Sequence, residues 1–168
     1  GIGEDATARA GQAAQGLAAA GKTPMIVAVD QTVVGVVAVA DKIRQDAPEM
    51  VARLHRAGVE KVVMLTGDTR LVAEAIGKAT GIDEIHASLL PEDKLDAVTE
   101  LQRQGHTIAM VGDGVNDAPA LATANIGVAM GAAGSAVAVE TADIALMGDN
   151  LLKLPEAIGL AKRTVAVM

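Results

Sequence analysis

One acidic turn constrains the fold more than any other segment of this chain. An apolar run at residues 107–111 has the composition of a buried strand, and the sequence GDGVNDAPAL follows it directly at residues 112–121. Glycines at positions 112 and 114 let the backbone turn sharply and approach a ligand closely. The pattern therefore predicts a strand that passes through a tight turn into a helix.

The turn carries oxygen ligands. Asp113 and Asp117 stand four residues apart, and Asn116 lies beside the second. Carboxylates in such a place suit Mg²⁺, which takes one or two carboxylates together with phosphate and water oxygens. The alternative is an ordinary acidic turn in which Asp113 or Asn116 caps the helix.

The rest of the chain alternates between helix and strand patterns. Residues 4–20 predict an Ala-rich helix ending at Gly21, and residues 25–29 and 33–39 predict a hairpin. From residue 41 onward, strands and helices follow one another. The expected fold is α/β, a Rossmann-like parallel sheet with helices on both faces, preceded by a helix and a β-hairpin from a second domain.

Composition narrows the possible functions. The chain has 168 residues, of which 51% are hydrophobic, with no aromatic residue and no Cys, and its net charge is −7. An acidic chain without stacking side chains is poorly suited to nucleic acid, so no nucleic-acid partner is expected. The longest strand-like apolar run, residues 33–40, is shorter than the roughly 20 residues of a membrane helix.

Several polar residues follow directly after predicted strands. Ligands of parallel α/β sheets gather beyond the carboxyl ends of the strands, so Thr66, Asp68, Asp113 and Asp117 are expected to meet at one edge. The Thr66 hydroxyl and the amides of Gly67 and Asp68 could serve phosphate oxygens at a helix start.

Lys94 and Asn116 complete the expected site. Lys94 falls in the first turn of a helix, where a cation is disfavoured unless it serves an anion. Asn116 could hydrogen-bond a phosphate or a bound water. Each element also has a plainer interpretation, in which TGDT at 66–69 is a turn with a helix cap and Lys94 is a solvated lysine.

One nucleotide-binding motif is rejected. Residues 16–23 fit the Walker A pattern letter for letter. A phosphate-binding loop must follow a strand and open a helix. Here a predicted helix precedes the motif, and Pro24 and a β-branched run follow it.

The motifs together resemble those of the P-type ATPases, ion pumps that pass through a phosphorylated aspartate. GDGVNDAPAL is similar to their signature, TGDT resembles their TGD motif, and residues 89–94 resemble their PxxK motif in the LPEDK form of the heavy-metal branch. The resemblance implies a haloacid dehalogenase-like fold and the use of Mg²⁺ and ATP. It places Asp113 and Asp117 at the metal, and it assigns the phosphoryl group to a set of five residues: Thr66, Gly67, Asp68, Lys94 and Asn116.

The resemblance also implies a missing piece. The family's phosphorylated Asp lies in a DKTGT motif on the central strand, and this sequence contains no DKTGT. We therefore expect a fragment with the end of a nucleotide-binding domain at 1–40, a phosphorylation domain at 41–158 without its central strand, and a lead-in to a membrane helix at 159–168. Its partners would be ATP or phosphate, the membrane helices, the actuator domain and the rest of the nucleotide-binding domain. The expected location is the cytosolic side of a bacterial plasma membrane, and the motif variants favour zinc, cadmium or cobalt as the ion.

Two alternatives stay open. Asp30 and Asp41 each end an apolar run upstream of TGDT, the layout of a stand-alone haloacid dehalogenase-type phosphatase with one of them as nucleophile. The chain could also be a non-catalytic module that binds Mg²⁺ or phosphate.

Overall fold

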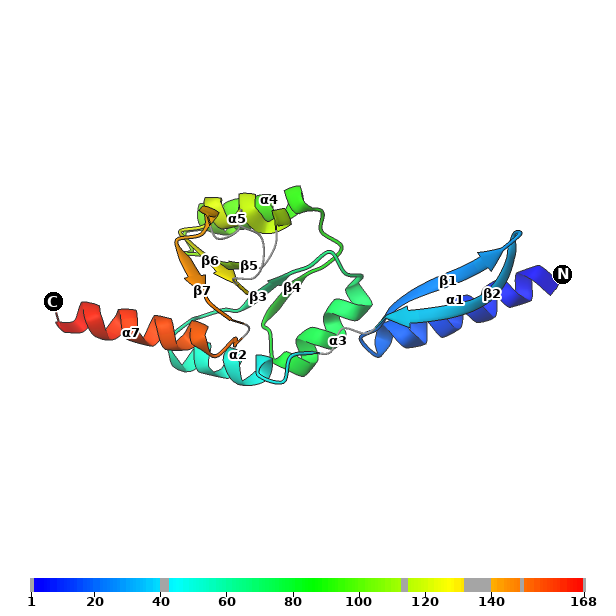
Figure 1. Ribbon diagram of the computed structural model, residues 1–168, viewed down its shortest axis with the longest axis horizontal. Helices are drawn as coiled ribbons and strands as arrows, with labels where there is room; N and C mark the ends of the chain where they lie inside the picture. Colours follow the sequence, from blue (N-terminus) through cyan, green and yellow to red (C-terminus); the bar gives the residue numbers. More distant parts are fainter. Residues whose placement is uncertain (1, 40–42, 113–114, 132–139, 149, 168) are drawn as a thin grey trace. The chain divides into compact units, whose positions relative to one another are not determined.

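The protein is divided into two compact units. A computed structural model describes residues 2–39, 43–112, 115–131, 140–148 and 150–167. The first unit contains residues 1–48 and 61–88, and the second contains residues 49–60 and 89–168 (Figure 1).

The first unit opens with a helix and a hairpin, as predicted. Helix α1 (Ile2–Ala19) lies along the antiparallel strands β1 (Thr23–Val29) and β2 (Thr32–Val39). Asp30 and Gln31 form the connection, with φ angles of 46° and 64°. Two left-handed residues in a two-residue loop match the twist of the strands they join. Because Gly16 lies within α1 and Thr23 starts β1, the helix precedes the strand, and the rejection of a Walker A loop is confirmed.

The same unit contains a parallel strand pair. Strands β3 (Val63–Leu65) and β4 (Glu84–His86) are linked by helix α3 (Arg70–Thr80). The helix is capped by Gly81, which has φ 79° and donates its N–H to the Gly77 carbonyl. The α3 residues Val72 and Ala73 are buried. Together these elements make one β-α-β unit.

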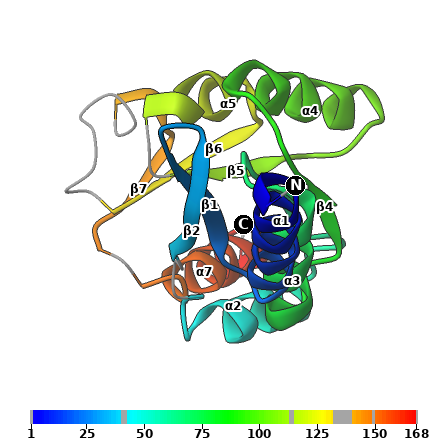
Figure 2. The same cartoon turned by 90° about the vertical axis from the view of Figure 1, so that its right-hand side faces the viewer.

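The second unit is built around a three-stranded parallel ladder. Its strands are β5 (Ala109–Gly112), β6 (Ile126–Met130) and β7 (Ile144–Leu146), with β6 in the centre. Helices α4 (Pro91–Arg103) and α5 (Ala118–Thr123) lie over β5 and β6 (Figure 2). A 3₁₀ turn, η1 (Val115–Asp117), leads into α5.

Two further helices lie side by side in this unit. Helix α2 (Ala47–Arg56), which belongs to the second unit from Glu49 onward, runs next to α7 (Lys153–Val167) in both views (Figures 1 and 2). The Lys162 ammonium donates to the carbonyl of Ala57, just past the end of α2. A cation there complements the negative end of the helix dipole.

The core of the second unit is packed from small aliphatic side chains. Val98 on α4 and Leu121 on α5 are the largest fully buried side chains of the described residues, and Val128 and Ala129 on β6 are buried as well. Asn125 ties the layers together, because its side-chain oxygen accepts the Ile108 N–H at 2.9 Å and the Gln102 side-chain amide at 3.2 Å.

The predicted α/β class with parallel strands and packed helices is confirmed, but the sheet is not continuous. The described residues form two separate parallel ladders, β3–β4 and β5–β6–β7, together with the antiparallel hairpin. A sequence without the expected central strand offers no backbone to join the two ladders. The division into domains at residues 40 and 158 stays a prediction, since the compact units follow other boundaries.

Among the helices of the described residues, none combines the length and the apolar character needed to cross a bilayer.

Candidate functional site

The loop after β3 is closed by its own hydrogen bonds. The Thr66 hydroxyl donates to a carboxylate oxygen of Asp68 at 3.1 Å and accepts the Asp68 N–H at the same distance. The Thr66 N–H continues the parallel ladder by donating to the His86 carbonyl at 3.0 Å. Both side chains are half-buried, whereas Gly67 is exposed. The Asp68 amide, expected to be free for phosphate, is therefore engaged within the loop.

A second segment of the first unit supports this loop. The Ser88 N–H donates to the Asp68 carbonyl at 2.7 Å, and Ser88 has a φ of 59°. Thr69 occupies the N-cap position of α3 in an extended conformation, without a side-chain cap hydrogen bond. The sequence pattern indicated the turn and the helix start, but it did not indicate the contribution of Ser88.

Glu84, the first residue of β4, interacts with two ionisable neighbours, Lys61 and His86. A hydrogen bond from Lys61 lowers the pKa of the Glu84 carboxyl below its ordinary value of 4.5, and a second bond to His86 adds to the effect. The hydrogen bond to Glu84 in turn raises the pKa of the Lys61 ammonium. This exposed pair connects the residues before β3 to β4.

The loop after β5 is organised around an ion pair. The Lys94 ammonium, from the first turn of α4, lies 2.8 Å from Oδ1 of Asp117. Both side chains are largely shielded, with 18% of Lys94 and 14% of Asp117 exposed. Asp117 ends η1 and stands at the N-cap position of α5. The anion that Lys94 was expected to serve is, in this structure, a carboxylate of the protein itself.

The remaining predicted residues of this loop lie differently. Asn116 is exposed. Asp113 falls outside the described residues, as does Asp41, one of the two alternative nucleophiles. Asp30, the other, is at the tip of the antiparallel hairpin and not at the carboxyl end of a parallel strand.

The donor set fits a hard divalent cation in part. Asp117 supplies a carboxylate whose Oδ1 is used by Lys94, and no other described residue donates to its Oδ2. A carboxylate with one open oxygen is a ligand that Mg²⁺ accepts when other oxygens complete its shell. Within the described part of the chain, no group of three or more His, Cys, Asp or Glu side chains gathers around one point. Any complete metal shell would therefore need Asp113, ligand oxygens or water.

The structure brings the predicted residues together in two groups. Thr66 and Asp68 meet in the first unit, and Lys94 and Asp117 meet in the second. The expected convergence of all these residues on one phosphoryl group stays a prediction.

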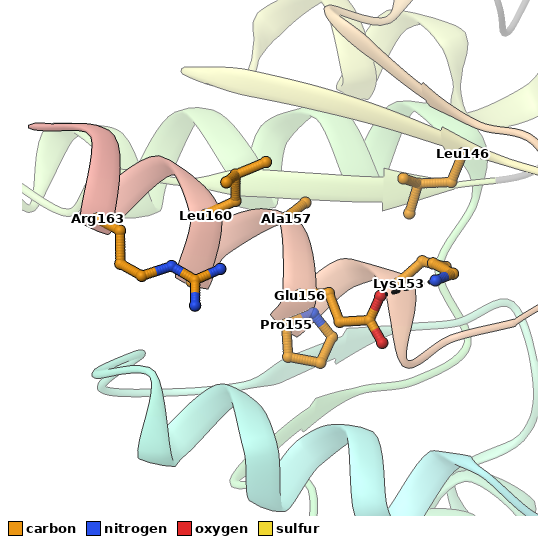
Figure 3. A pocket seen from close by; sticks show the side chains of 8 residues that line it. Leu146, Lys153, Pro155, Glu156, Ala157, Leu160 and Arg163 are labelled. Atoms are coloured by element: carbon orange, nitrogen blue, oxygen red, sulfur yellow. Dashed lines mark hydrogen bonds and ion pairs between the residues drawn. The ribbon is translucent and has the colours of Figure 1, made fainter.

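Two cavities lie elsewhere. One of about 670 Å³ in the second unit is lined by α7 and Leu146, with the ion pair of Lys153 and Glu156 at its rim and Arg163 at its far end (Figure 3). Another of about 780 Å³ in the first unit is bounded by residues near the end of α1 and by α3. Neither is lined by a predicted site residue.

Comparison with known proteins places these features in a family context. Residues 4–125 match the haloacid dehalogenase-like hydrolase family. The chain is 48% identical over 148 residues to a cadmium-transporting ATPase of Staphylococcus aureus, and 50% identical over 147 residues to a manganese-exporting P-type ATPase of Mycobacterium leprae. Each alignment covers 88% of this chain and 20% of the relative.

A solved structure agrees with the sequence comparison. A zinc-transporting PIB-type ATPase in its E2.Pi state superimposes with a TM-score of 0.76 at 43% identity, over 93% of this chain and 25% of that one. The chain thus spans about a fifth to a quarter of the length of the pumps it resembles. Since the family match covers well over half of the sequence, this chain belongs to the haloacid dehalogenase-like hydrolases.

Proposed function

We propose that this chain is a cytosolic catalytic part of an ATP-driven heavy-metal cation pump. In that pump it would bind Mg²⁺ and the phosphoryl group while an aspartyl phosphate forms and is hydrolysed. Support comes from relatives that are named metal-transporting ATPases and share about half of their aligned residues with this chain.

The observation that carries the proposal is the shielded pair of Lys94 and Asp117. The ammonium of Lys94 is held against Asp117, in the loop that follows the parallel strand β5. Ligands of such sheets bind beyond the carboxyl ends of the strands, so a cation there can meet an anionic ligand. Phosphoryl transfer depends mainly on positioning and on neutralising charge, so an ammonium at such a place has a direct use.

The roles of the individual residues follow from their chemistry. Asp113 and Asp117 would hold Mg²⁺, which supplies charge neutralisation at the phosphoryl oxygens when bound. The Thr66 hydroxyl, the Gly67 amide and the Lys94 ammonium would donate to those oxygens. Asp68 would orient Thr66, and Asn116 would hydrogen-bond the phosphate or a water.

The phosphorylated aspartate would be provided by sequence outside this chain. The sequence lacks DKTGT, and its two parallel ladders are separate, which is what a sheet without its central strand would leave. We infer that the partners of this chain are the membrane helices, the actuator domain and the rest of the nucleotide-binding domain. The pump would lie in a bacterial plasma membrane, with zinc, cadmium or cobalt as the favoured ion.

No observation favours the alternative of a stand-alone phosphatase. A nucleophilic Asp in this fold belongs at the carboxyl edge of the parallel sheet, where the metal and phosphate residues gather. Asp30 instead forms a left-handed hairpin turn.

Magnesium binding and turnover test the proposal together. Calorimetric titration should detect Mg²⁺ binding that Asp113→Asn abolishes and that Asp96→Asn, at an exposed position on α4, leaves unchanged. The chain should not hydrolyse p-nitrophenyl phosphate. Turnover that disappears in Asp30→Asn or Asp41→Asn would contradict the pump proposal and establish the phosphatase.

A further inference from the structure

The end of strand β5 has no room for a side chain. A Cβ at Gly112, the last residue of β5, would lie 2.9 Å from Cβ of Asp117 and 3.0 Å from its Oδ2. Two non-bonded carbon atoms do not approach that closely, so any side chain at 112 forces Asp117 to move. The backbone of Gly112 needs no left-handed conformation, because its φ is not among the positive values. The demand for glycine at this position is therefore one of space.

Asp117 can yield only in part through its side chain. It stands at the N-cap position of α5, and the following residues Ala118, Ala120 and Leu121 are buried, the last two to within 1%. Rotating the Asp117 side chain moves Cγ and Oδ2 away from a new side chain at 112 but leaves Cβ in place, because Cβ lies on the rotation axis. The 2.9 Å contact therefore also requires a small shift of the backbone at 117 against those buried residues. A side chain at 112 should therefore turn the carboxylate of Asp117 away from its present place.

The carboxylate in turn fixes Lys94. The lysine stem is flexible, and Asp117 is the one described residue that accepts a hydrogen bond from its ammonium. The two residues are 23 positions apart, and they come from α4 and from the end of η1. With the carboxylate turned away, the ammonium has no anchor and can extend toward solvent.

We propose that Gly112 is a positioning residue for Lys94. The bare Cα at 112 sets the carboxylate of Asp117, and the carboxylate sets the ammonium that serves phosphoryl oxygens. The use of that ammonium rests on the proposed function, but the mechanical link between the three residues does not. Asp117 accordingly has a role besides metal binding, which is to hold Lys94 in place when no phosphate is bound.

Phosphate affinity gives the first test. Binding of inorganic phosphate in the presence of Mg²⁺ should weaken about tenfold in Lys94→Met, because a charge-assisted hydrogen bond is lost. Gly112→Ala should weaken it to a similar degree, and the double variant should be no weaker than either single one. Gly35→Ala is the matched control, since a Cβ at that strand glycine meets nothing within 4 Å. Unchanged phosphate affinity in Gly112→Ala, or full additivity with Lys94→Met, overturns the inference.

A second test needs no ligand and guards against a variant that folds poorly. Gly112→Ala should lower the unfolding midpoint in the natural background, but not in an Asp117→Gly background, where its Cβ has no partner. An equal loss in both backgrounds overturns the inference. So does a crystal structure of Gly112→Ala in which the contact between Lys94 and Asp117 persists at 2.8 Å. If the unsubstituted chain binds no phosphate, the proposed function fails while these two measurements still decide the role of Gly112.

Discussion

The loops that follow β3 and β5 are equivalent in the β-α-β pattern but are held together in opposite ways. In the first, the hydroxyl of Thr66 and the amide and carboxylate of Asp68 bond to one another across two residues. In the second, the carboxylate of Asp117 is bonded to a lysine 23 residues away. The side-chain contacts of the first loop are local, with a further hydrogen bond to the Asp68 carbonyl from Ser88, whereas the side-chain contact of the second joins α4 to the residue before α5.

This difference bears on how each loop can respond to a ligand. A locally closed loop keeps its shape whether or not neighbouring elements move, since its hydrogen bonds span residues that are already close in sequence. An ion pair between two elements depends on the packing that brings them together. Removing either partner leaves the other as an unpaired charge. We expect substitutions in the core to disturb the first loop little and the second loop more.

The largest expected effect comes from a glycine that packs against α5. A Cβ at Gly127 on β6 would lie 2.6 Å from the backbone oxygen of Leu121, and a backbone atom in a buried helix cannot step aside. Gly127→Ala should therefore lower the free energy of unfolding by about 3 kcal/mol, at the upper end for overpacking. Urea denaturation would measure the change.

Gly77 on α3 is the matched position in the first unit. Its Cβ would meet Cδ1 of the Ile85 side chain and, at 3.1 Å, its Cγ1, and both belong to a side chain that can rotate. Alanine also favours the helix by about 1 kcal/mol. Gly77→Ala should cost clearly less than Gly127→Ala. Equal losses would show that the two glycines are constrained alike and would weaken the contrast between the units.

The ion pair should give the next largest effect. Lys94→Met leaves a largely shielded carboxylate without its partner, and we expect the free energy of unfolding to fall by about 2 kcal/mol. Lys153→Met is the control, because its pair with Glu156 is exposed and should contribute nothing measurable. A loss as small as that of the control would mean that water already screens the pair of Lys94 and Asp117.

The local loop should lose less. Thr66→Val keeps the shape of the side chain but removes both hydrogen bonds to Asp68, for a loss of about 1 kcal/mol. Thr99→Val is the comparison, since the Thr99 hydroxyl bonds only to a carbonyl of its own helix, a contact that stabilises little. If Thr66→Val lowers stability more than Lys94→Met does, the local loop is the more critical of the two.

The smallest effect concerns pH. The pKa of Glu84 is lowered by Lys61, so the pair stabilises the fold above the ordinary carboxyl pKa of 4.5, and this contribution disappears as the pH falls through the folded-state value. Glu84→Gln should therefore be slightly less stable than the natural chain at pH 7 and equally stable at pH 3. Thermal unfolding at the two pH values would measure the difference, and a gap that persists in acid would point to a role other than charge.

Much of the local structure was predictable from sequence. The helix end at Gly21 and the hairpin between residues 25 and 39 were correctly expected, because a helix-ending glycine and strand periodicity act over a few residues. TGDT was correctly expected as a turn into a helix, for the same reason. The family resemblance was likewise carried by contiguous motifs, and it is confirmed by the comparisons.

Other features could not be predicted from the sequence. Nothing in the sequence around Lys94 indicates that its partner is Asp117, nor that Gly112 is glycine because a carboxylate five positions later occupies the space. The resemblance implied a sheet without its central strand, but which strands pair within the two parallel ladders came from the structure alone. Strand neighbours are chosen by long-range packing, which periodicity does not encode.

The sequence by itself determined the kinds of element, their order and the chemical types gathered in the motif loops, since these depend on interactions between neighbouring residues. Only the tertiary structure decided which charged groups meet and which glycines must remain bare. Both depend on distances of a few ångströms between segments that lie far apart along the chain, and those distances exist only once the core has packed.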